Sequence, residues 1–215
     1  MEIVLGIIVL VFSAILHEVA HGLVADKLGD PTARLMGRLT LDPRKHIDPF
    51  LSLALPALLI FTHSPIIFGG AKPVPVDPYN LPEGRKDLAL VSLAGPLTNV
   101  LLAITASFLI KGVLLFGMVT NLILTVIVTI VYAFLFQVVQ INILLAIFNL
   151  LPIPPLDGSK IFSLLLPEQE AQIFLSLDQI GMLVLFVLLI FPIGNFSLSN
   201  VINTAFLFIM HLLGI

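Results

Sequence analysis

His17, Glu18 and His21 lie inside an otherwise apolar segment near the start of the chain. Residues four apart share one face of an α-helix, so the two imidazole rings can bind one metal ion. Glu18 then projects about 100° away, beside the open coordination position. Histidines at this spacing, with a glutamate as general base, are typical of zinc hydrolases. The spacing therefore predicts a hydrolytic metal site on the first helix.

A catalytic zinc site needs a third protein ligand besides the two histidines. The chain has no cysteine, which leaves histidine and carboxylate side chains as candidates. Asp157 is the only carboxylate between Asp87 and Glu168, and apolar residues surround it in the sequence. Because an unpaired carboxylate in lipid is costly, a cation beside it is expected. We therefore predict that Asp157 completes the ligand set of one Zn²⁺ per chain.

Two further residues are assigned to catalysis. Glu18 is expected to take a proton from water and later deliver it to the leaving amine. Asn149 precedes Asp157 by eight residues across a proline-broken turn, so its amide could face the same cavity. There it would bind the substrate backbone or the developing oxyanion. The alternative for Asn149 is a helix cap or a hydrogen bond to a neighbouring helix.

The composition places these residues in a membrane protein. Of the 215 residues, 59% are hydrophobic and only 11% are charged, and the mean hydropathy is +1.14. A soluble domain of this size needs far more charged surface, so lipid must solvate most of the chain. The net charge of −3 argues against nucleic acid as a partner.

The apolar segments predict an all-α polytopic bundle of about five to six transmembrane segments. The expected spans are residues 3–24, 88–116, 121–151, 179–192 and 198–213. We treat residues 1–215 as a single domain. Its parts are the first span (1–25), a cytoplasmic-side region (26–87), the core spans (88–166) and the C-terminal spans (167–215).

Two asparagines, Asn99 and Asn142, lie inside the predicted core spans. Amide side chains in such positions commonly bond to neighbouring membrane helices. We interpret both as interhelical hydrogen-bonding residues, and we interpret Gly95 as a position of close helix approach.

The region between the first span and the core spans contains two irregular segments. Residues 33–41 alternate loosely and end at an Asp-Pro turn, which predicts a small membrane-associated β element. Arg38 and Leu39 lie on this element, whose exposed edge could bind an extended substrate peptide. The apolar stretch within residues 50–68 is only about a dozen residues long, which favours a re-entrant or interfacial segment, although a crossing stays open.

The basic residues indicate how the chain is oriented. Nine of the ten Lys and Arg residues lie within segments 25–49, 69–86 and 152–178. Basic residues favour the cytoplasmic side, so we predict a multi-pass protein of the cytoplasmic membrane with an external N-terminus. If residues 50–68 turn back, His21 and Asp157 reach the same depth with this topology, and the active site lies toward the cytoplasm.

Several motifs resemble those of the site-2 protease family of intramembrane zinc metalloproteases. They are HExxH at residues 17–21, AGPLTN at 94–99, NxxPxxxLDG at 149–158, GRLTLDP at 37–43 and GAKPV at 70–74. The last two look like the short prokaryotic branch, without PDZ or CBS domains. The resemblance touches nearly everything between residues 13 and 160.

This resemblance implies an endopeptidase that cleaves transmembrane segments of membrane proteins, as in regulated intramembrane proteolysis. The implied partners are a transmembrane substrate, the lipid bilayer and an upstream site-1-type protease or adaptor.

Two non-proteolytic functions are the alternatives. A membrane zinc carrier could use the same ligands, but a carrier is expected to have repeated halves and further ionisable residues along a path, which this sequence lacks. An inactive scaffold could bind membrane helices, but such a scaffold has no need of Glu18.

Overall fold

Three long helices dominate the structure. The computed structural model describes residues 2–47, 61, 72–116 and 122–215. The long helices are α1 (Glu2–Leu28), α4 (Arg85–Phe116) and α5 (Leu122–Asn149), and each is long and apolar enough to cross a membrane. The described part of the chain is mainly helical, so the prediction of a helical membrane protein is confirmed.

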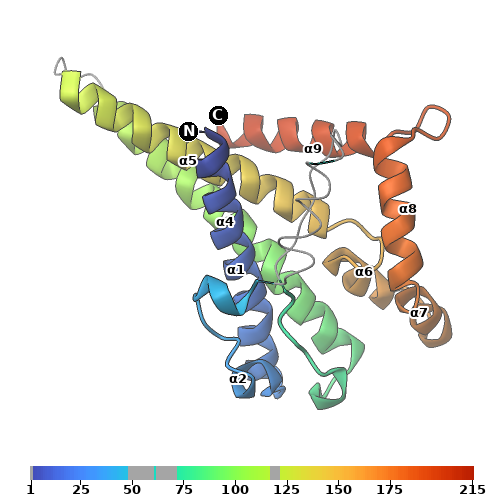
Figure 1. Ribbon diagram of the computed structural model, residues 1–215. Helices are drawn as coiled ribbons and strands as arrows, with labels where there is room; N and C mark the ends of the chain where they lie inside the picture. Colours follow the sequence, from blue (N-terminus) through green and yellow to red (C-terminus); the bar gives the residue numbers. More distant parts are fainter. Residues whose placement is uncertain (1, 48–60, 62–71, 117–121) are drawn as a thin grey trace.

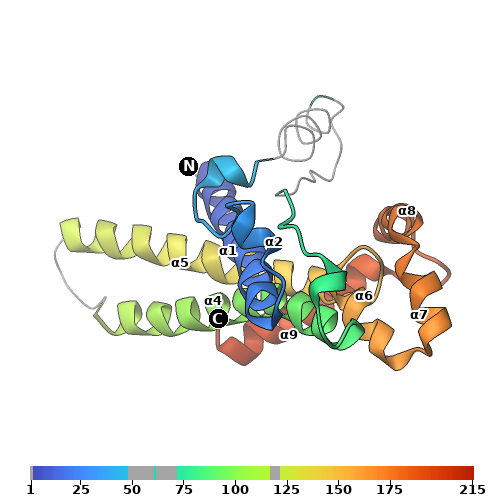
Figure 2. The same ribbon diagram turned by 90° about the horizontal axis from the view of Figure 1, so that it is seen from below.

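The three long helices pack on one another. α4 and α5 lie side by side, and α1 crosses both of them (Figures 1 and 2). Ala103 and Ala106 on α4 share a buried cluster with Leu135 and Val139 on α5. Small side chains such as alanine let membrane helices approach closely. The three helices form a packed frame, in which His17 and His21 of α1 contact residues of α4.

The chain after α5 forms shorter helices. α6 (Asp157–Phe162) follows a proline-rich turn and packs against α4. The 3-10 turn η4 (Ser163–Leu165) and helix α7 (Glu168–Leu175) then lead into α8 (Asp178–Ile190). The first residue of α6 is therefore held against the three-helix frame.

The predicted number of five to six spans is not confirmed. Among the described residues three helices could cross a membrane, or four if α7 and α8 form one span broken by a bend of 68°. The expected last span forms α9 (Leu198–Leu213), which has 16 residues. A helix of that length measures about 24 Å, whereas the hydrocarbon core is about 30 Å thick. α9 runs across the end of α8 (Figure 1).

The predicted β element at residues 33–41 is wrong. Thr32–Leu35 instead form the helical turn α2, and no strand occurs in the described ranges apart from an isolated bridge between Ile193 and Phe196. The amide of Arg38 donates to the Ala33 carbonyl at 2.9 Å. Since such bonds close the turn on itself, its backbone groups are not available to a neighbouring strand.

The remaining described loop segments are short. Pro43–Lys45 form the 3-10 turn η1, and residues 72–77 are extended and lead into the 3-10 turn η3 (Pro78–Asn80). The predicted re-entrant segment, residues 50–68, lies outside the described residues except for Phe61.

A buried carboxylate joins the end of α1 to the loop before η3. Asp30 is fully buried and accepts hydrogen bonds from Thr32 N at 3.1 Å, Asn80 Nδ2 at 3.0 Å and Asp77 N at 2.8 Å. Burial raises the pKa of Asp30, but the hydrogen bonds from these groups outweigh it, so the pKa lies below its ordinary value of 3.8. Asp30 thus holds the extended loop against α1.

The loss of this carboxylate should reduce stability in a pH-dependent way. Because the folded pKa of Asp30 is lowered, its stabilisation is present above pH 3.8 and is lost as the pH falls through the folded pKa. We expect Asp30→Asn to cost about 1–3 kcal/mol at pH 7, since the new amide nitrogen cannot accept from Asp77 N. Thermal unfolding of the purified protein at pH 7 and below pH 4 measures this, and the difference from wild type should shrink in acid.

Asp26→Asn is the matched control. Asp26 pairs with the exposed Arg34 at 2.9 Å, and such surface pairs contribute only about 0–1 kcal/mol. Equal losses in the two variants, or a loss for Asp30→Asn that persists in acid, would contradict the assigned role.

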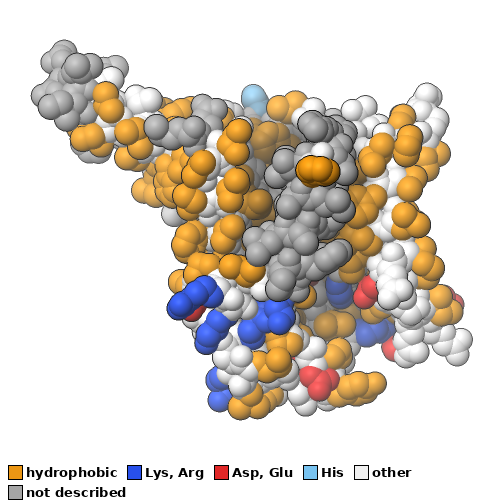
Figure 3. Space-filling view, viewed as in Figure 1, with side chains coloured by type: hydrophobic (Ala, Val, Ile, Leu, Met, Phe, Trp, Pro, Cys, Tyr) orange, Lys and Arg blue, Asp and Glu red, His pale blue; other side chains and the backbone are white. Residues whose placement is uncertain are grey.

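The charged side chains are not spread evenly. Figure 3 shows Lys and Arg gathered toward the end of the molecule where α1 ends and α2 lies, while hydrophobic side chains are the commonest described side chains on the rest of the visible face. Several of the exposed large hydrophobic residues lie on α1, among them Ile3, Ile7 and Phe12. This distribution fits a protein whose helices contact lipid.

Candidate metal centre

Three side chains from distant parts of the sequence meet between α1, α4 and α6. The Nε2 atoms of His17 and His21, on consecutive turns of α1, lie 3.0 Å apart. Asp157 Oδ2 lies 3.1 Å from the first of these atoms and 3.3 Å from the second. The structure therefore brings together the three residues that the sequence predicts as metal ligands.

The turn after α5 places Asp157 in this group. The chain passes through a cis peptide bond between Pro154 and Pro155, and α6 begins at Asp157. Gly158 follows, and a Cβ there would overlap the carbonyl groups of Leu150 and Leu151. Only glycine fits this close approach, which holds the first turn of α6, with Asp157 at its start, against the end of α5.

Gly95 on α4 leaves room for the two histidine rings. A Cβ built at this position would lie 2.5 Å from His17 Cε1 and 2.6 Å from His17 Nε2, and it would also overlap His21 Nε2. Real Cβ atoms essentially never come so close to other heavy atoms. The absent side chain therefore leaves the space that both imidazole rings occupy, as the interpretation of Gly95 as a close-approach residue predicts.

The donor set fits a zinc ion. Both histidines are more than nine-tenths buried, and the three ligand atoms lie within 4.8 Å of one another. Tetrahedral zinc with bonds of about 2.0–2.1 Å places its ligand atoms about 3.3 Å apart. The observed separations of 3.0–3.3 Å are close to this value.

Each imidazole is also held at its other nitrogen. His21 Nδ1 lies 2.7 Å from the Val91 carbonyl, and His17 Nδ1 lies 2.6 Å from Asn99 Oδ1. A carbonyl oxygen only accepts hydrogen bonds, so His21 Nδ1 carries the proton and Nε2 presents its lone pair to the centre. That tautomer is the one that binds a metal through Nε2.

Glu18 lies beside this group on the next face of α1. Its Oε2 accepts a hydrogen bond from the Val74 amide at 2.7 Å, and the side chain is half-buried. The contact joins the helix to the extended segment 72–77. The sequence predicted the place of Glu18 next to the histidines, but not its contact with this loop.

Arg38 and Leu39 have different surroundings from those predicted. Arg38 is buried, and its Nη2 donates to the carbonyls of Lys72 at 2.8 Å and Pro73 at 3.3 Å. The Leu39 side chain packs close to Gly22 on α1. Neither residue lies on a strand edge, because the predicted strand does not form. Arg38 instead holds Lys72 and Pro73, and the next residue, Val74, donates to Glu18.

Asn149 is the last residue of α5 and is half-buried. Its Nδ2 donates to the Leu145 carbonyl of its own helix at 3.1 Å. The structure thus shows the helix-end hydrogen bond that was the alternative interpretation. A role of Asn149 in binding substrate stays a prediction.

Asn99 contacts the proposed ligand His17 at Nδ1, although the sequence predicts only an interhelical role for this residue. Val91, Gly95 and Asn99 are spaced by four residues and share the face of α4 that meets α1. Each of the three touches or accommodates a histidine ring. This spacing was the signal that could have identified Asn99.

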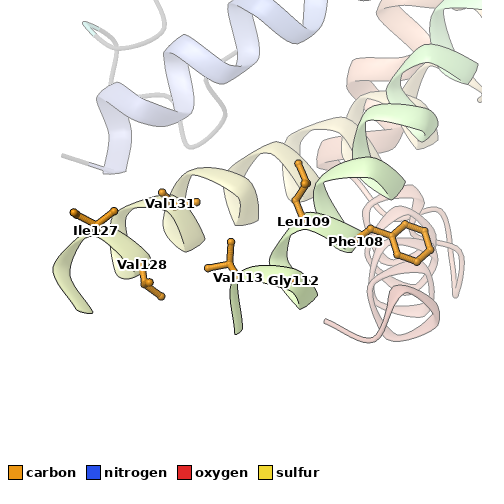
Figure 4. A pocket seen from close by; sticks show the side chains of 7 residues that line it. All are labelled: Phe108, Leu109, Gly112, Val113, Ile127, Val128 and Val131. Atoms are coloured by element: carbon orange, nitrogen blue, oxygen red, sulfur yellow. The ribbon is translucent and has the colours of Figure 1, made fainter. Parts of the chain in front are cut away.

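An apolar groove between α4 and α5 lies elsewhere on the molecule (Figure 4). Its lining consists of Phe108, Leu109, Gly112, Val113, Ile127, Val128 and Val131. These residues carry no metal-binding, nucleophilic or acid–base group. The groove is therefore not a second candidate for the chemical site.

Buried imidazole and carboxylate groups inside apolar helices are typical of functional sites in membrane proteins. Fold and site together thus define a membrane protein with a candidate metal centre of hydrolase type.

Comparison with known proteins identifies the family. Residues 5–192 match the model of "Peptidase family M50". The chain is 38% identical over 197 residues to "Putative zinc metalloprotease YwhC" of Bacillus subtilis, covering 92% of this chain and 85% of that protein. It is 32% identical over 183 residues to "Putative zinc metalloprotease Rip2" of Mycobacterium tuberculosis H37Rv, covering 85% of this chain and 65% of Rip2.

The chain belongs to peptidase family M50, which confirms the site-2 protease family and the metalloendopeptidase class predicted from its motifs. No solved structure shows significant similarity to the chain.

Proposed function

We propose that the protein is a zinc-dependent endopeptidase that cleaves transmembrane segments of membrane proteins within the bilayer. The observation that carries this proposal is the group of His17, His21 and Asp157, whose histidines are buried between apolar helices and whose carboxylate is partly buried, with Glu18 beside it. Membership of peptidase family M50 supports it, as does the similarity to the putative zinc metalloproteases YwhC and Rip2.

His17, His21 and Asp157 would hold one zinc ion. When bound, zinc supplies Lewis-acid chemistry, by which water becomes more acidic and a carbonyl group is polarised. The residues of the chain provide the remaining requirements: a fixed ligand geometry, a base, and a way to present the substrate.

Glu18 is the proposed general base and acid. Its carboxylate accepts a proton from the attacking water and later donates that proton to the leaving amine. The Val74 amide holds Oε2, which fixes the orientation of the carboxylate. Arg38 supports this arrangement, since it binds the carbonyls of the two residues before Val74.

The substrate must lose its helical hydrogen bonds before water can attack a peptide bond. An unwound segment then needs polar partners near the site. We propose Asn149 as one such partner for the substrate backbone or the developing oxyanion, which requires its amide to leave the Leu145 carbonyl. We assign Arg38 and Leu39 to shaping the substrate site from behind the extended loop.

We place the protein in the cytoplasmic membrane, with its N-terminus outside and its active site toward the cytoplasm. The gathering of Lys and Arg at the end where α1 terminates supports this orientation (Figure 3). The proposed partners are a transmembrane substrate and an upstream site-1-type protease or adaptor. Both follow from the family rather than from any contact within this chain.

Cleavage of a model transmembrane substrate in liposomes tests the proposed function. Glu18→Gln should lower the cleavage rate by about 10²–10⁴-fold, because general acid–base catalysis contributes about that much. Its zinc content should stay at the wild-type level, since Glu18 is not a ligand. The control Glu83→Gln alters an exposed carboxylate that pairs with Lys86 and should cleave normally.

Two results would contradict the proposal. Full cleavage by Glu18→Gln would remove the assigned base. Zinc transport across the liposome at equal rates in wild type and Glu18→Gln, without cleavage in either, would favour a zinc carrier.

A further inference from the structure

A chain of buried hydrogen bonds leads from the candidate centre into the apolar core. Asn99 Oδ1 lies 2.6 Å from His17 Nδ1, and Asn99 Nδ2 donates to Asn142 Oδ1 at 2.7 Å. Asn142 Nδ2 in turn donates to Ser13 Oγ at 2.9 Å and to the Val138 carbonyl at 2.8 Å. The chain joins α1, α4 and α5, and its two asparagines are fully buried.

We infer that Asn99 and Asn142 are positioning residues that fix the tautomer of His17 and thereby its capacity to bind a metal through Nε2. The inference rests on the proposed function in so far as His17 is a zinc ligand. Both asparagines act through the imidazole ring of His17, and neither is proposed to contact the substrate.

The donor and acceptor of each hydrogen bond in this series follow from the Val138 carbonyl at its far end. The Val138 carbonyl can only accept, so the NH₂ group of Asn142 must face it and the Asn142 oxygen must face Asn99. That oxygen also only accepts, so Asn99 presents its NH₂ group to Asn142. The Asn99 oxygen is thereby left facing His17.

His17 must then donate from Nδ1, because the Asn99 oxygen cannot. With the proton on Nδ1, the lone pair of the neutral ring lies on Nε2, which faces Asp157 and His21. The backbone carbonyl of Val91 achieves the same result for His21 in one step. For His17, Nδ1 faces the side-chain amide of Asn99. The Val138 carbonyl therefore fixes the tautomer indirectly, because it orients Asn142, and Asn142 orients Asn99.

A purely structural role would also explain two buried asparagines, since amides commonly join membrane helices. The two interpretations differ in what they predict for the metal. Interhelical bonding predicts a loss of stability alone, whereas tautomer control predicts weaker zinc binding per folded molecule. Partners that orient metal ligands typically change metal affinity by 10–100-fold when removed.

Zinc titration against a competing chelator, on folded protein in lipid nanodiscs, separates these interpretations. Asn99→Leu and Asn142→Leu should each weaken zinc binding by about 10–100-fold. Ser13→Ala should change it by less than about threefold, because Val138 still orients Asn142. Gln140→Leu, an amide-to-leucine change two residues from Asn142 on α5, is the matched control and should bind zinc as wild type does.

A second readout needs neither metal nor activity. In metal-free protein with ¹⁵N-labelled histidine, the nitrogen spectrum of wild type should show His17 protonated at Nδ1, whether or not Nε2 carries a second proton toward Asp157. In Asn142→Leu a fraction of His17 should lack the Nδ1 proton and carry its proton on Nε2, because Asn99 is then free to turn its NH₂ group toward the ring. Asn99→Asp keeps an oxygen facing Nδ1, so it should retain the wild-type tautomer and bind zinc far better than Asn99→Leu.

The possible outcomes distinguish this inference from the proposed function. Wild-type zinc affinity and an unchanged His17 spectrum in the folded leucine variants would overturn the inference, whether or not the protein cleaves. If Asn99→Leu does not fold, Asn142→Leu still decides, since it leaves Asn99 in place. Failure of the wild type to cleave any transmembrane substrate would overturn the proposed function, while the differences in affinity and spectrum would remain.

Discussion

Asp157→Asn should bind zinc at least about 100-fold more weakly than wild type and should lose cleavage with it. The variant keeps the shape of the side chain but replaces an anionic ligand by a neutral amide, which leaves two imidazoles to hold the ion. Changes outside the ligand set already cost 10–100-fold in affinity, so loss of a ligand sets this lower bound. Zinc content after dialysis against a chelator, together with cleavage of a transmembrane substrate, measures the effect.

Asp178→Asn is the control for this experiment. Asp178 is also the first residue of a helix, α8, but it is exposed and lies outside the candidate centre. It should keep wild-type zinc content and cleavage. Wild-type zinc affinity in Asp157→Asn would remove Asp157 from the ligand set and would leave the third ligand to another residue.

Gly95→Ala should disrupt the centre without changing any ligand. The added Cβ would come within 2.6 Å of His17 Nε2 and would also overlap His21 Nε2, so the rings or the two helices must shift. Overpacking of this kind typically costs 1–3 kcal/mol. Because the moved rings no longer converge with Asp157, zinc affinity should fall by about tenfold or more. Thermal unfolding and zinc titration measure the two effects.

Gly112→Ala on the same helix provides the comparison. A Cβ at Gly112 meets no atom within 4 Å among the described residues, and alanine favours helix more than glycine does by about 1 kcal/mol. Gly112→Ala should therefore be as stable as wild type or more stable, with unchanged zinc binding. If Gly95→Ala behaves in the same way, the close approach of α4 to the histidines is not needed for metal binding.

The sequence predicted those parts of the site that depend on local spacing. His17 and His21 share a helix face because they are four residues apart, and no distant contact is needed to establish that. Asp157 could be predicted because it is an isolated carboxylate inside apolar sequence. The long spans followed from hydropathy in the same way, since α1, α4 and α5 each carry enough apolar residues to cross a bilayer.

The features that were missed depend on contacts between distant segments. Glu18 and Val74 are 56 residues apart, and no local pattern around either residue indicates that the Val74 amide will donate to the Glu18 carboxylate. Residues 33–41 were predicted to form a strand from alternation alone. The backbone bond from Arg38 to Ala33 closes a turn there instead, and the Arg38 guanidinium binds a loop 34 residues away.

The centre draws two of its donors from the first helix and the third from a residue 140 positions later. During biosynthesis the ribosome must therefore add most of the chain before the set can close. At roughly 5–20 residues per second, that interval is on the order of ten seconds. A nascent chain that has inserted only α1 holds two of the three proposed ligands, so under the proposed function hydrolytic capacity arises only once α6 has docked.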